Sequence, residues 1–128
     1  MKYKFLLLFA AFCLFAAAQS NKFVTVDNGH FLKDGKPYYY VGTNFWYGAI
    51  LGSEGQGGNR QRLVRELDLM KRMGIDNLRI LVGSDGERGV TTKVEPTLQV
   101  RPGVYTDTIL AGLDFLLMEM GKRQMVTT

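Results

Sequence analysis

Apolar residues occur along this chain in two spacings that alternate. The segments Tyr38–Val41 and Leu78–Val82 are short, nearly continuous apolar runs, a pattern typical of strands that are buried on both faces. Between them, from Asn59 to Met73, apolar residues recur every three or four positions, as they do on one face of a helix. The order predicts a β-α-β unit, and the apolar stretch Gln124–Thr128 predicts the start of a third strand.

The segment Pro37–Gly48 contains the first strand and the residues that we expect to form a site. Gly42 interrupts the strand, as glycine often does where backbone or ligand comes close. Asn44, Trp46 and Tyr47 follow at its carboxyl end, which is where α/β sheets and barrels place ligands. The pattern predicts an inner strand whose carboxyl end faces a binding site.

The first predicted helix begins at the cap residue Asn59, runs to about Met73 and stops at Gly74. Glu66 and Asp68 are expected to be solvated helix charges rather than catalytic acids. The expected buried stripe is Leu63, Leu67, Met70 and Met73, and the expected i,i+4 ion pairs are Arg62–Glu66 and Asp68–Arg72.

The second predicted helix begins at Thr106 or Asp107 and ends at Gly121. Asp114 and Glu119 are expected to be surface charges. The apolar face is expected to comprise Ile109, Leu113, Leu116, Leu117 and Met120.

Turn residues predict a small antiparallel hairpin ahead of these units. Asn28-Gly29 and Asp34-Gly35 are strong hairpin signals because these residue types accept positive φ angles. His30, the single histidine, is expected on the surface of this hairpin. Without a second histidine or a cysteine cluster, the sequence offers no zinc ligand set.

Two long loops are predicted, at residues 48–59 and 82–105. The first is rich in glycine but has neither the G-x-G-x-x-G nor the G-K-[ST] spacing, so a nucleotide site is not favoured, and a flexible loop at the mouth of a site is expected. Asp85, just past the second strand, could touch a ligand, although an Asp-Gly turn needs no such role.

Arg79 is the one charged residue inside the second apolar run. Burying an unpaired charge is costly, so Arg79 is expected either to meet a carboxylate or to point into a polar site. A purely structural ion pair is the alternative.

Several motifs, taken in order, resemble the opening of the glycoside hydrolase family 5 β-mannanases. They cover the chain from about Phe23 onward and are Gly29–Tyr38, Gly42–Gly48, Asn77–Ile80, Gly103–Tyr105, Gly112–Asp114 and Gly121–Arg123. The resemblance implies a (β/α)8 barrel and a retaining enzyme that acts on β-mannan, without a cofactor.

The resemblance also implies roles for individual residues. Arg79 matches the arginine on the second strand that orients the nucleophilic glutamate and keeps it ionised, and a charge-assisted hydrogen bond has that effect. Asn44, Trp46 and Tyr47 match the strand end that lines the sugar cleft, with Asp85 as a further candidate contact. The acid/base and the nucleophile of that family are glutamates on its fourth and seventh strands, and neither maps to a position in this sequence.

The first 18 residues are expected to be a secretory signal peptide. Lys2 and Lys4 precede an apolar run at residues 5–15, and Ala16–Ala18 supplies a small-residue cleavage site. Cys13 follows a bulky residue, which does not favour lipidation. Cleavage would leave 14 basic and 12 acidic residues, an ordinary balance that gives no indication of nucleic acid as a partner. We expect a secreted protein, extracellular or periplasmic, with no membrane association after cleavage.

A (β/α)8 barrel typically needs ~250 residues, whereas this sequence has 128. Residues 19–128 are therefore predicted to be the amino-terminal portion of such a barrel, with two βα units and the start of a third strand, and to be inactive alone. The alternative is a non-catalytic secreted protein that binds carbohydrate through Trp46 and Tyr47.

Overall fold

The computed structural model describes residues 23–87 and 94–128. The predicted signal peptide lies outside these residues. The chain divides into two compact units between Tyr39 and Tyr40. No helix in the two described ranges has both the length and the apolar content needed to cross a membrane.

The first unit is a three-stranded antiparallel sheet. Its strands are β1 (Thr25–Asp27), β2 (His30–Lys33) and β3 (Lys36–Pro37), in the order β1-β2-β3. Both connections have positive φ at their two central residues, 46° and 80° at the first turn and 52° and 72° at the second. These values are those of the turns that fit the twist of a hairpin, so the predicted hairpin is confirmed and gains a third strand.

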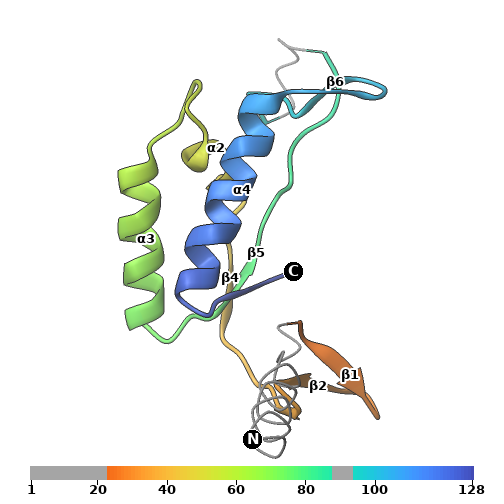
Figure 1. Ribbon diagram of the computed structural model, residues 1–128, viewed down its shortest axis with the longest axis vertical. Coiled ribbons are helices and arrows are strands. Elements are labelled where there is room, and N and C mark those ends of the chain that lie inside the picture. Colours follow the sequence, from red (N-terminus) through yellow and green to blue (C-terminus); the bar gives the residue numbers. More distant parts are fainter. Residues whose placement is uncertain (1–22, 88–93) are drawn as a thin grey trace, which may run out of the picture. The chain divides into compact units, whose positions relative to one another are not determined.

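The second unit is a parallel sheet with two long helices against one face (Figure 1). Strands β4 (Gly42–Asn44), β5 (Asn77–Arg79) and β8 (Val126–Thr127) pair in the order β4-β5-β8. Helix α3 (Arg60–Arg72) connects the first two strands, and α4 (Asp107–Lys122) precedes the third. The predicted β-α-β order and the third strand are confirmed.

The core of this unit lies between the sheet and the two helices. Its buried residues include Phe45, Leu63, Leu67, Leu78, Leu116 and Met120. Phe45, which directly follows β4, is thereby a core residue.

The expectation that the first strand is buried on both faces is wrong. Only Gly42–Asn44 form a strand, and both Gly42 and Asn44 are exposed, while the side chain of Tyr39 upstream is 84% exposed. The helices cover one face of the sheet, so residues on the other face stay open. Strand β5 is likewise shorter than predicted and ends at Arg79.

Helix α3 begins and ends as predicted, but part of its pattern differs. The Asn59 side chain accepts a hydrogen bond from the Arg62 backbone N–H at 2.9 Å, and Gly74 takes a positive φ of 83°. Met73, however, caps the helix and is 67% exposed rather than buried. Asp68 pairs with Arg123 of the α4 end at 2.8 Å instead of with its predicted partner.

Helix α4 extends past its predicted stop. Gly121 lies within the helix, and Gln124 takes the left-handed conformation, with φ of 56°. Glu119 is buried rather than on the surface, whereas Asp114 is exposed as predicted. Of the predicted apolar face, Leu117 is exposed.

Both predicted loops contain secondary structure. A short helix, α2 (Gly48–Gly52), occupies the start of the first loop and packs closely on α4. A two-stranded antiparallel pair, β6 (Gln99–Arg101) and β7 (Val104–Tyr105), lies in the second. The apolar residues in these three segments show neither clear helical nor clear strand spacing. Packing against the rest of the unit therefore determines that α2, β6 and β7 form.

Candidate functional site

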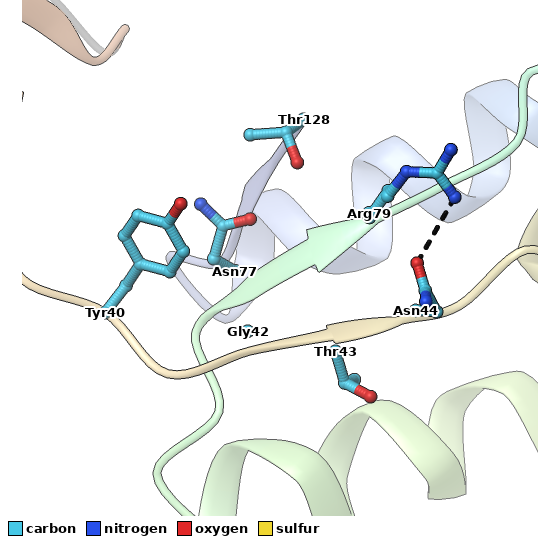
Figure 2. Close-up of a pocket in the computed structure, with 7 residues that line it drawn as sticks. All are labelled: Tyr40, Gly42, Thr43, Asn44, Asn77, Arg79 and Thr128. Atoms are coloured by element: carbon cyan, nitrogen blue, oxygen red, sulfur yellow. Dashed lines mark hydrogen bonds between the residues drawn. The ribbon is translucent and has the colours of Figure 1, made fainter.

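Asn44 and Arg79 meet on the open face of the parallel sheet. They end β4 and β5 respectively and are direct register partners, so both side chains lie on the same face of the sheet. Because the neighbouring Leu78 is buried in the core beneath the helices, this face is the one that points away from them. Arg79 Nη1 donates to Asn44 Oδ1 at 3.3 Å (Figure 2). Two strands thus bring together residues that are 35 positions apart in the sequence.

These two side chains line an open depression of about 330 Å³. Figure 2 shows that Asn77 and Thr128 share this side of the sheet, whereas Thr43 points toward a helix. The lining residues are Tyr40, Gly42, Thr43, Asn44, Asn77, Arg79 and Thr128. The surface offers hydrogen-bonding groups and one positively charged side chain, and none of its lining residues has a carboxylate side chain.

Arg79 meets no carboxylate among the residues that the structure describes. Its recorded partner within residues 23–87 and 94–128 is the Asn44 amide, and its side chain is exposed. The prediction of an ion pair rested on burial, and here water can solvate the guanidinium. Arg79 lines a depression with hydrogen-bonding groups, which agrees with the other expectation, that its side chain points into polar surroundings. The guanidinium has five donors, of which the contact with Asn44 uses one.

Trp46 and Tyr47 lie beside one another just beyond β4. The Tyr47 ring meets the Phe45 ring edge-on at 4.7 Å between centroids and the Trp46 ring edge-on at 5.3 Å. Phe45 is buried in the core, whereas Trp46 is 46% exposed. The three rings therefore lead from the core to the surface.

Trp46 does not line the depression that contains Arg79. It lines a smaller apolar hollow together with Ile50, Leu81, Val82, Pro96 and Ile109, among others. Asp85 lines neither hollow, and its Oδ1 accepts a hydrogen bond from Gln99 Nε2 at 2.9 Å. The predicted site residues thus form two pairs, Asn44 with Arg79 and Trp46 with Tyr47, with Asp85 apart.

Glu66 contacts Tyr47, which the sequence did not predict. It was expected to be a solvated helix charge, but its Oε2 accepts the Tyr47 hydroxyl at 2.8 Å, and its Oε1 accepts Arg62 Nε at 2.5 Å. The i,i+4 spacing predicted the contact with Arg62. The contact with Tyr47 spans 19 residues and depends on how α3 lies beside α2, for which no sequence signal exists.

The Tyr47 phenol has a raised pKa. Burial disfavours the phenolate, and the hydrogen bond to the Glu66 carboxylate favours the protonated form further. The hydroxyl therefore remains a donor at neutral pH and holds the ring toward α3.

Comparison with known proteins assigns the family. Residues 21–128 match the sequence profile described as GH (glycoside hydrolase) family 5 beta-mannosidase-like. The chain belongs to this family.

Two groups of relatives agree with the assignment. The chain is 28% identical over 118 residues to mannan endo-1,4-beta-mannosidase 3 of Solanum lycopersicum, a match that covers 92% of this chain and 26% of the relative. The crystal structure of the family 5 mannosidase from Rhizomucor miehei superposes with a TM-score of 0.80 at 32% identity, over 87% of this chain and 28% of that one.

A mutant of the Rhizomucor miehei enzyme in complex with mannosyl-fructose also matches, with a TM-score of 0.80 at 33% identity, over 86% of this chain and 27% of that one. The mixed α/β fold described above thus resembles that of family 5 enzymes. The chain spans about a quarter of the length of the relatives that it matches.

Proposed function

We propose that this chain supplies the first βα units of a secreted, retaining (β/α)8 glycoside hydrolase that cleaves β-1,4-mannan. The observation that carries the proposal is the Asn44–Arg79 pair. It lies at the carboxyl ends of adjacent parallel strands, on the face that the helices leave open. In barrel enzymes, ligands bind at the carboxyl ends of the strands.

Arg79 is proposed to act on a carboxylate supplied by another part of the enzyme. Retaining glycosidases need two carboxyl groups ~5–5.5 Å apart, one as nucleophile and one as acid/base. The depression provides the cation for such a group but no acid of its own. A charge-assisted hydrogen bond from Arg79 would keep the nucleophile ionised and oriented, while the Asn44 amide holds the guanidinium in place.

The proposed substrate is a neutral β-mannan. The Solanum lycopersicum relatives are named for mannan, and the Rhizomucor miehei mutant was solved with mannosyl-fructose. Trp46 suits such a substrate because its flat apolar face covers the C–H side of a pyranose while its N–H can hydrogen-bond a hydroxyl. The proposal also includes export by the signal peptide at residues 1–18 and catalytic glutamates located outside residues 1–128.

The test uses the native secreted protein that contains this sequence, identified by intact mass and assayed for release of reducing ends from β-1,4-mannan. Changing Arg79 to Ala should lower kcat by about 10²–10³, the usual effect of removing one electrostatic donor. Arg101→Ala is the matched control, because Arg101 is an exposed strand arginine in β6. Unchanged hydrolysis in the Arg79 variant, or no hydrolysis by the native protein, contradicts the proposal.

A non-catalytic mannan-binding protein is the second candidate. The half-exposed indole of Trp46, which offers a flat apolar face to a sugar ring, favours it. Binding of mannan oligosaccharides without any release of reducing ends by the native protein would support this candidate over the hydrolase.

A further inference from the structure

We infer that Glu66 is a positioning residue. Its carboxylate holds the Tyr47 hydroxyl and so fixes the Tyr47 ring. Trp46 packs edge-on against this ring, which orients the indole toward substrate. The inference rests on the proposed function, because Trp46 is taken to contact the sugar. Glu66 lies on helix α3, on the opposite side of the sheet from the depression.

Tyr47 is fixed at both ends. Its backbone forms the N-cap of α2, and its carbonyl oxygen accepts a hydrogen bond from the Leu51 backbone N–H at 3.0 Å. Its hydroxyl, at the far end of the ring, is held 2.8 Å from Glu66 Oε2. A ring tied at both ends has little freedom to rotate, so its edge is a fixed surface for the neighbouring indole.

Glu66 is itself fixed before it holds Tyr47. Arg62 Nε binds Oε1 one helical turn away, and the Arg62 guanidinium carbon lies 5.5 Å from the centre of the Tyr47 ring. The carboxylate therefore has one oxygen for Arg62 and the other for Tyr47. Hydrogen bonds to an ionised carboxylate are shorter and stronger than those between neutral groups, which makes this contact suited to locking a ring.

Trp46 can move on its solvent-exposed side if this support is lost. Nearly half of its side chain is exposed, and the hollow beside it is lined by loop residues that include Val82 and Pro96. Its edge-on contact with Tyr47, at an interplanar angle of 80°, is the packing contact that connects it through Tyr47 to the core ring Phe45. Loss of the Tyr47 anchor should therefore change the orientation of the indole more than the stability of the fold.

The experiment places 5-fluorotryptophan in the native secreted protein and follows the ¹⁹F resonance that disappears in Trp46→Phe. Without sugar, Tyr47→Phe and Glu66→Ala should each shift or broaden this resonance. Glu66→Gln should restore it, because the amide oxygen still accepts the hydroxyl. The matched control is Glu54→Ala, which removes a glutamate paired with Arg60 at 2.7 Å but not in contact with Tyr47.

Kinetics on mannan separate positioning from general loss of structure. Tyr47→Phe and Glu66→Ala should raise KM about three- to tenfold, as for one lost hydrogen bond, with kcat and the melting temperature nearly unchanged. An unmoved resonance in both variants, or an equal shift in Glu54→Ala, overturns the inference. A resonance that responds to these variants but never to mannotetraose would instead overturn the proposed sugar contact at Trp46, and so the proposed function at this position.

Discussion

Glu119 is a carboxylate buried where α4 ends beside α3. Only 7% of the residue is exposed, and it accepts hydrogen bonds from Lys122 Nζ at 2.6 Å and Arg123 Nη1 at 2.7 Å. Arg123 also donates to Asp68 of α3, and through this contact it ties the two helices together. The hydrogen bonds from Lys122 and then Arg123 lower the pKa of Glu119.

This lowered pKa makes a stability contribution that depends on pH. A carboxyl group whose pKa is lower in the folded state than in the unfolded state stabilises the fold fully at pH values above its ordinary pKa of 4.5. This stabilisation is lost as the pH falls through the lowered pKa of the folded state. In urea unfolding, the stability advantage of the unmodified protein over Glu119→Gln should therefore shrink as the pH falls below the ordinary pKa of 4.5. Asp114→Asn, an exposed change on the same helix, should show no comparable trend; an advantage that is independent of pH would contradict the assignment.

At the scale of elements, α2 and α4 cross with their backbones in contact. A Cβ atom placed on Gly112 would lie 2.2 Å from the carbonyl oxygen of Ala49, and one on Gly52 would lie 2.2 Å from the carbonyl oxygen of Gly112. Neither neighbour is a flexible side chain that could move aside. The crossing therefore requires glycine at both positions.

Gly112→Ala should destabilise the protein by about 1–3 kcal/mol or more, because overpacking here strains backbone. Gly121→Ala is the matched control on the same helix, since a Cβ there meets nothing within 4 Å. That change should be neutral or stabilise by roughly 0.5–1 kcal/mol, as alanine does relative to glycine within a helix. Thermal melts of the two variants measure the difference, and equal melting temperatures would contradict the proposed close crossing.

At the scale of the whole molecule, the parallel sheet has two open edges. Among the strands in residues 23–87 and 94–128, β4 and β8 each pair on one side only, with β5. Unpaired strand edges and an uncovered sheet face need further strands or helices for stability. In the proposed barrel, other parts of the enzyme would pair with both edges.

Residues 19–128 alone should accordingly unfold with little cooperativity, bind a hydrophobic dye, and release no reducing ends from mannan. Amide hydrogen exchange should be faster at β4 and β8 than at β5, whose backbone is bonded on both sides. The native protein that contains this sequence is the control. Cooperative unfolding together with mannan hydrolysis by residues 19–128 would contradict both this expectation and the view that the catalytic glutamates lie elsewhere.

The local pattern of the sequence was sufficient to predict several elements. The Asn59 cap, the Gly74 stop and the two hairpin turns were predicted correctly because each depends on the intrinsic preferences of one or two residues. The β-α-β order followed from the spacing of apolar residues. The resemblance to family 5 also came from the sequence, through motifs in a fixed order, and the family match confirms it.

Tertiary structure decided what depends on partners far apart in the chain. Asp68 pairs with Arg123, 55 residues away, and Tyr47 with Glu66, 19 residues away, and neither separation carries a helical or strand period. Packing likewise determines that Glu119 is buried, that Asn44 and Arg79 meet on an open face, and that Trp46 faces a different hollow. The sequence thus determined the hairpin turns, the two long helices, the β-α-β order and the family, whereas α2, the β6–β7 pair and the contacts that arrange the site arise only when the helices and strands pack together.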